Sequence, residues 1–290
     1  MISGIVALLG SAALATASQG PGLATLSMPV VEVPMDLSTH HIAVEVSIDG
    51  QGPFPFNLDT YAVTTACVDE RFAERMGFEK VGTTMNSDGS GEERRLDVVL
   101  IPELRLGGAT FRDVRALVDD YSWVSTPDGG SIDGLLGYHL FRELLLELDY
   151  PGKRIVLREG ELPANGDHVV SHSALRTRPD FPLQIGGKRL IIGIDSGAQA
   201  GLSLPRSLID ELEFVHPPAI IGRAQTVYSK ADVLAGVLAG AVRFAGHEHV
   251  RTEASFSEIF GMPMIGHGLM AEYSVTFDQK NGRVRFARPK

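Results

Sequence analysis

The chain has 290 residues, 44% of them hydrophobic and 21% charged, and its formal net charge is −10. This length suits two lobes of roughly 100–150 residues each, and the hydrophobic content supports a packed core rather than wholesale disorder. The acidic balance argues against a nucleic-acid-binding protein, which usually presents a basic face. The single cysteine, Cys67, excludes an internal disulfide and a four-cysteine zinc site.

The N-terminus favours export. Residues 4–14 read GIVALLGSAAL, and Ala15-Thr16-Ala17 offers a small-x-small cleavage site. The apolar run is shorter than the roughly 20 residues that cross a bilayer, so it fits a secretory signal peptide and not stable membrane insertion. No Lys or Arg precedes it, and a buried or unstructured N-terminal tail is the alternative. We expect a signal peptide over residues 1–17 and a periplasmic or secreted protein.

Strand signals dominate the rest of the chain. Residues 40–50, HHIAVEVSIDG, alternate apolar and polar side chains and end at an Asp-Gly turn, and further short apolar runs follow between Gly, Pro and Asp. Two stretches predict helices: 68–77, closed by Gly77, and 204–214, with Ser203 as its N-cap. Many short strands with few helices indicate an all-β architecture.

The second half of the chain repeats the first. Three segments recur in the same order: 58–77 in 194–213, 104–114 in 242–252, and 134–157 in 264–286. The offsets are nearly constant, at 136 residues for Asp59 and Asp195 and at 138 and 129 residues for the other two pairs. We therefore predict two copies of one β-rich lobe, over residues 28–160 and 165–290, with 159–167 as the linker.

The repeated motifs resemble those of pepsin- and retropepsin-type aspartic proteases, in the single-chain, two-lobed form found in bacteria. The matching parts are Asp-Thr at 59–60, Asp-Ser-Gly-Ala at 195–198, the paired GLLG and MIGHG elements, and a closing hairpin in each lobe. The resemblance covers about residues 28–288. It implies two related β-barrel-like lobes with a few short helices, and an aspartic-type endopeptidase that cleaves an extended peptide or protein substrate. It implies no cofactor and no metal, and it leaves the oligomeric state open.

Amide hydrolysis by this route needs a water held between two carboxylates, one ionised to take its proton and one protonated to polarise the scissile carbonyl. Two carboxylates so close cannot both ionise cheaply, so they share one proton. The resemblance implies that Asp59 and Asp195 are this catalytic pair, and that Thr60 and Ser196 hydrogen-bond across it.

Three glycines complete the expected support of the site. Gly197 follows Asp195-Ser196, and the resemblance implies that Gly137 and Gly266 pack beneath the two aspartate loops. The alternative is that both aspartates are turn residues, with Thr60 and Ser196 as ordinary turn hydroxyls. The matched second copy favours the catalytic interpretation, whereas the glycines are structural on either.

A glycine-rich stretch at 83–95 centres on Asp88-Gly89-Ser90-Gly91 and resembles the flap that closes over substrate in this family. An exposed loop with no role is the alternative. The corresponding stretch of the second lobe, 222–232, has no glycine-rich tip, which favours a single flap.

Tyr61 departs from the family pattern, in which Gly follows Asp-Thr. Gly permits backbone angles that Tyr strongly disfavours, and a side chain there would crowd the catalytic pair. Either the phenol points outward or across the cleft and Asp59 stays in reach, or the first lobe has lost its geometry. In the second case the protein is a catalytically impaired peptide-binding relative, and a structural role of the fold is a third option.

Two minor motifs receive structural interpretations. His-Glu-His at 247–249 is interpreted as a solvated strand, and Cys67 as a small buried side chain at the start of the first helix.

Overall fold

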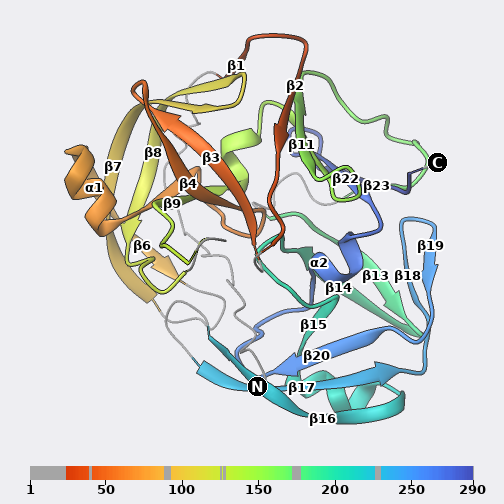
Figure 1. The fold of residues 1–290 in the computed structure, drawn as a ribbon. Helices are drawn as coiled ribbons and strands as arrows, with labels where there is room; N and C mark the ends of the chain where they lie inside the picture. Colours follow the sequence, from red (N-terminus) through yellow and green to blue (C-terminus); the bar gives the residue numbers. More distant parts are fainter. Residues whose placement is uncertain are drawn as a thin grey trace.

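The computed structural model describes residues 24–38, 41–87, 93–124, 126, 129–171, 178–225 and 230–289. These residues form three β-sheets with few short helices, and the all-β, two-lobed architecture expected from the sequence is confirmed (Figure 1). The predicted signal peptide at 1–17 and the glycine-rich tip at 88–91 lie outside the described residues.

The first sheet takes all its strands from residues 24–137. In spatial order they are β1 (Ala24–Leu26), β8 (Ala109–Asp119), β5 (Ala66–Asp69), β9 (Gly134–Gly137), β4 (Gln51–Asp59), β3 (Ile42–Ile48), β7 (Glu93–Leu106) and β6 (Glu79–Ser87). β4 runs parallel to β9, which places Asp59 opposite Gly137, and β9 pairs antiparallel with β5. The first aspartate and the apolar-apolar-Gly element are thus direct neighbours.

The second sheet takes its strands from residues 180–265. Its spatial order is β16 (Phe214–Gln225), β17 (Lys230–Leu238), β20 (Glu253–Ser257), β15 (Leu202–Pro205), β21 (Met264–Ile265), β14 (Lys188–Ile194), β13 (Asp180–Ile185), β18 (Val242–Phe244) and β19 (His247–His249). β14 runs parallel to β21, and β21 pairs antiparallel with β15. This repeats the β4–β9–β5 arrangement, so the duplication read from the sequence is present in the strand topology.

The third sheet joins the two halves. Its order is β12 (Val169–Ser171), β23 (Arg283–Ala287), β22 (Ser274–Asp278), β10 (Leu145–Asp149), β11 (Arg154–Arg158) and β2 (Val30–Pro34). The closing hairpin of each half lies here, and the two hairpins meet where β10 pairs antiparallel with β22, Leu148 opposite Val275. The backbone ladder is therefore continuous from one lobe to the other.

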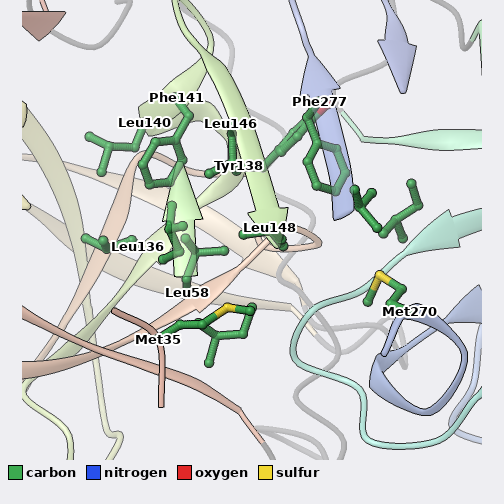
Figure 2. Packing of buried hydrophobic residues seen from close by; sticks show 14 of the residues in the cluster. Met35, Leu58, Leu136, Tyr138, Leu140, Phe141, Leu146, Leu148, Met270 and Phe277 are labelled. Carbon is green, nitrogen blue, oxygen red and sulfur yellow. The ribbon is translucent and has the colours of Figure 1, made fainter. Parts of the chain in front are cut away.

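One hydrophobic core runs under both halves. Leu58 and Leu136, beside the first aspartate loop, belong to the same cluster as Met270 and Phe277 from the C-terminal half, and Figure 2 labels all four. The rings of Tyr138 and Phe277 meet edge to face with centroids 5.7 Å apart. Each fully buried Leu or Phe stabilises the fold by about 1.5–3 kcal/mol, so this core holds both halves together.

The helix α1 (Glu70–Met76) confirms the prediction over 68–77. Asp69 caps its N-terminus by accepting a hydrogen bond from Arg71 N at 3.0 Å. Gly77 ends it in the left-handed conformation, φ 65°, which glycine adopts without steric cost.

The other helical segments are short: η1 (Tyr138–Phe141), η2 (Arg206–Glu211) and α2 (His267–Met270). The helix predicted over 204–214 is present only in part, as the 3₁₀ helix η2, and residues 204–205 belong to β15 instead. Ser203 is not an N-cap, since it lies in β15, held between β20 and β21. None of the helices in the described part of the chain is long and apolar enough to cross a membrane.

Candidate active site

The two aspartates occupy equivalent places in the two lobes. Asp59 is the last residue of β4, and Asp195 follows β14 directly. Both are almost fully buried, with exposed fractions of 2% and 0%. Because each strand is paired in parallel with its apolar-apolar-Gly strand, each aspartate emerges at the same end of its sheet.

Each carboxylate is held by the backbone of its own loop. Asp59 Oδ1 accepts hydrogen bonds from Tyr61 N at 2.7 Å and Ala62 N at 3.1 Å. Asp195 Oδ1 accepts one from Gly197 N, also at 2.7 Å. The loop therefore has the same local geometry with Tyr61 as with Gly197. Tyr61 is not among the described non-glycine residues with positive φ, so this position does not require a glycine-only backbone conformation.

Thr60 and Ser196 connect the two loops. Thr60 N donates to Ser196 Oγ at 2.9 Å, and Ser196 N donates to Thr60 Oγ1 at 3.0 Å. The Thr60 hydroxyl then donates to the Ile194 carbonyl at 2.8 Å, and the Ser196 hydroxyl to the Leu58 carbonyl at 2.9 Å. The hydrogen bonds that the resemblance implied are present, and they bring the two aspartate loops into direct contact.

Burial sets the electrostatics of the pair. Burial raises the pKa of Asp59 to about 6, although the N–H groups of Tyr61 and Ala62 oppose this shift. Burial and then the nearby Asp59 carboxylate raise the pKa of Asp195 well above its usual range. Asp195 Oδ2 has no hydrogen-bond partner among the residues that the structure describes. Because the charge of each buried carboxylate disfavours ionisation of the other, the pair retains a proton at a pH at which two isolated carboxyls would both be ionised.

The glycines of the apolar-apolar-Gly elements lie against these loops. A Cβ on Gly137 would lie 2.2 Å from the Thr64 carbonyl oxygen, and one on Gly266 would lie 2.4 Å from the carbonyl oxygens of Ala198 and Ala200. Such distances leave no room for a side chain. Both glycines therefore allow a close backbone approach beneath an aspartate loop.

The side chain of Tyr61 crosses into the second lobe. Its residue is 1% exposed, and its ring belongs to a cluster with second-lobe residues only: Ala224, Val233, Ile259, Phe260 and Met264. The hydroxyl donates to Met262 Sδ, and the Arg178 guanidinium lies 5.2 Å from the ring centroid. A Cβ on Gly193 would lie 2.3 Å from Tyr61 Cε2. The sequence left two arrangements open, and the structure shows the first. The phenol points across to the second lobe, and Asp59 keeps its hydrogen bonds from the backbone N–H groups of Tyr61 and Ala62.

Two residues near Asp195 were not singled out from the sequence. His267 follows Gly266, and its Nε2 lies 2.6 Å from the Ser196 carbonyl oxygen. The Tyr150 ring meets His267 edge to face, with centroids 5.4 Å apart, and burial followed by the charge of Asp195 raises the pKa of Tyr150. The only signal in the sequence was the unusual residue after Met-Ile-Gly.

The minor motifs have structural roles. The interpretation of 247–249 as a solvated strand is wrong for His247, which is buried and has Nε2 2.8 Å from the Phe286 carbonyl oxygen. Cys67 is buried as expected but lies in β5, ahead of the helix, and burial raises its pKa to about 12. Within the described ranges, no group of three or more His, Cys, Asp or Glu residues is placed to hold a metal.

Comparison with known proteins agrees with this geometry. Residues 44–140, which include Asp59 and Gly137, match the family model described as aspartyl protease. A search of curated proteins found no match. The match covers residues 44–140, so this part of the chain is similar to aspartyl proteases of the retropepsin-like type.

Proposed function

We propose that the protein is an aspartic-type endopeptidase in which Asp59 and Asp195 activate one water between them. The observation that carries this proposal is the reciprocal Thr60–Ser196 hydrogen bonding, which joins two buried aspartates with raised pKa values. Buried carboxyls whose pKa values are shifted by desolvation and by each other are typical of catalytic sites.

In the proposed reaction, the ionised carboxyl of the pair takes a proton from the water, whose oxygen attacks the scissile carbonyl carbon. The protonated carboxyl donates to the carbonyl oxygen, giving a tetrahedral diol. A proton then passes from the pair to the leaving nitrogen as the carbon–nitrogen bond breaks. The rigid Thr60–Ser196 connection contributes by holding both carboxyls in position before substrate arrives.

The test is cleavage of an unfolded polypeptide across the acid and neutral range, followed by mass spectrometry. The rate should fall on both sides of a bell, because one carboxyl must be ionised and the other protonated. Asp59→Asn and Asp195→Asn should each abolish cleavage with an unchanged circular dichroism spectrum. Asp69→Asn is the matched control, since Asp69 is a buried aspartate at the N-cap of α1, away from the pair. Cleavage that survives both substitutions would reject the aspartic mechanism.

A second candidate is a peptide-binding protein that does not cleave. The observation that favours it is the buried Tyr61 ring, which takes up space between the lobes. An extended peptide would then bind as an added strand, held through its backbone. An inert wild type that protects a bound peptide from a second protease would support this candidate.

A further inference from the structure

The Tyr61 ring lies beside the catalytic face of the second lobe. Gly193 is the second-last residue of β14 and Asp195 follows the strand directly, so the two-residue period of the strand puts them on the same side. The ring packs directly over Gly193. Burial is the main cause of the raised pKa of Tyr61, and the carboxylates of Asp180, Asp195 and Asp59 add to it. The ring is therefore within electrostatic reach of both members of the pair.

The duplication shows what the ring replaces. In the first lobe, the residue two positions before the aspartate is Asn57, the counterpart of Gly193. The counterpart of Tyr61 in the second lobe is Gly197, which has no side chain to send back toward Asn57. The second lobe thus receives the Tyr61 ring beside Gly193, whereas the first lobe receives no side chain from Gly197 beside Asn57.

The two sides also differ in free space. Asn57 is 2% exposed and lines a cavity of about 720 Å³, together with Pro55 and Ile132. Its Nδ2 has no hydrogen-bond partner within the described part of the chain. On the Gly193 side, the equivalent space is closed by Tyr61.

The second-lobe cluster includes one residue from the first lobe, Tyr61. The corresponding cluster of the first lobe is filled by that lobe's own residues, including Tyr121, Val124 and Leu135. In the second lobe, Met264 is the counterpart of Leu135, and the cluster contains two rings, the lobe's own Phe260 and Tyr61 from the first lobe. The Tyr61 ring is held by these apolar neighbours, by its hydroxyl's hydrogen bond to Met262 and by the Arg178 guanidinium. It therefore forms part of the wall of the pocket beside Asp195.

We propose that Tyr61 determines specificity by filling the apolar pocket beside Asp195, so that the substrate residue on that side of the scissile bond must be small. The residue on the other side of the bond, toward Asn57, has no such restriction. The substrate class is a peptide with Gly, Ala or Ser on one side of the cleaved bond and a larger side chain allowed on the other. This proposal rests on the proposed function.

The experiment compares three peptides that differ only at the cleaved bond: Ala-Ala, Phe-Ala and Ala-Phe. Wild type should cleave Ala-Ala and one of the two Phe peptides, and should cleave the other at least about 10-fold more slowly in kcat/KM, the discrimination that a filled apolar pocket provides. Tyr61→Ala should raise kcat/KM for the excluded peptide at least 10-fold relative to that for the accepted peptide. Tyr61→Phe is the matched control, because it keeps the ring and should keep the exclusion.

Folding and activity are separated by two further measurements. Tyr61→Leu, which leaves a smaller void, should give an intermediate recovery if Tyr61→Ala fails to fold. p-Cresol, the side chain of tyrosine, should raise the Tm of Tyr61→Ala and not that of wild type, since a vacated apolar cavity binds a matching ring.

The outcomes distinguish this proposal from the proposed function. If wild type and variants cleave nothing, the endopeptidase proposal fails, and the three peptides in reduced-amide form are tested by calorimetry for the same ranking of binding. An unchanged ranking between wild type and Tyr61→Ala, in cleavage or in binding, overturns the role of Tyr61. The role of Tyr61 in specificity is also overturned if the wild type cleaves none of the three peptides while Tyr61→Ala is active. The ring would then block the cleft and not select among substrates.

Discussion

Thr60 and Ser196 exchange hydrogen bonds in both directions between the two halves of the chain, at 2.9 Å and 3.0 Å. Each hydroxyl also donates to a carbonyl on the other half, Ile194 for Thr60 and Leu58 for Ser196. Every donor and acceptor in this buried set finds its partner in the opposite lobe. The position of Asp59 relative to Asp195 is therefore fixed by backbone and hydroxyl groups, independently of the carboxyls themselves.

Removing one hydroxyl from this set should weaken the fold. Thr60→Val keeps the shape of the side chain but leaves Ser196 N and the Ile194 carbonyl without their partner. Each buried unsatisfied group costs about 1–3 kcal/mol in the free energy of unfolding. Urea denaturation measures the loss, and Thr60→Ser, which keeps the hydroxyl, is the control. Equal stability of the Val and Ser variants would show that the hydrogen bonds contribute nothing.

Tyr61 and Gly193 should be energetically coupled. Gly193→Ala places a Cβ 2.3 Å from the Tyr61 ring, so it should destabilise the wild type by about 1–3 kcal/mol. In the Tyr61→Ala background the same change should cost close to nothing, and the cycle should show a coupling of about 0.5–3 kcal/mol. Gly187→Ala is the control, because nothing lies within 4 Å of its Cβ. If the effects of the two substitutions on stability were additive, the Tyr61 ring would not be in contact with Gly193.

Gly266→Ala should impair catalysis more than folding. Its Cβ would lie 2.4 Å from two backbone oxygens of the Asp195 loop, and backbone can yield only by moving that loop. A shift of about 1 Å in a catalytic group costs up to about 100-fold in rate. The measurement is kcat of the folded variant, with Gly82→Ala, whose Cβ meets nothing within 4 Å, as the control. Wild-type kcat in Gly266→Ala would show that the loop does not depend on this contact.

The buried pair should make stability depend on pH. Burial raises the pKa of Asp59 from 3.8 to about 6 on folding. The contribution of such a group is fully present below its unfolded pKa, near 4, and is lost as the pH rises past about 6. Asp59→Asn cannot ionise, so it should gain stability over wild type between pH 4 and pH 7, by up to about 3 kcal/mol. Thermal denaturation at several pH values measures this difference.

Asp149 supplies the control with the opposite sign. Burial opposes ionisation there, but hydrogen bonds from Ser274, Gly152 and Arg154 outweigh it and lower the pKa of Asp149. Asp149→Asn should therefore lose stability relative to wild type as the pH rises from acid toward neutral. A Tm difference for Asp59→Asn that stays constant across the range would show that Asp59 is not desolvated in the folded protein.

The sequence predicted the parts of the fold that depend on local pattern. The constant offset paired Asp59 with Asp195, and the apolar spacing and Gly77 predicted α1. Ser203 as an N-cap and Pro205 near the first turn favour a helix over 204–214. Pairing with strands on both sides holds residues 202–205 in β15, and that tertiary contact is absent from any local window.

The position of the Tyr61 side chain could not be predicted from local sequence pattern either. Its partners, Val233 and Met264, are far away in the chain, so no local window connects them to Tyr61. A signal was nonetheless present: Gly193 stands where the first lobe has Asn57. The ring and the missing side chain compensate each other, and such pairs are visible only when both lobes are compared position by position.

In the proposed reaction, Asp59 and Asp195 act as one proton-sharing unit. Its most direct test is kcat/KM of Asp59→Asn, Asp195→Asn and the double variant on one peptide that wild type cleaves. Because removing either half disables the unit, we predict that each single substitution loses as much activity as the double one, at least about 10³-fold. A single variant that keeps more than a tenth of wild-type activity, or losses that multiply in the double variant, would contradict the claim.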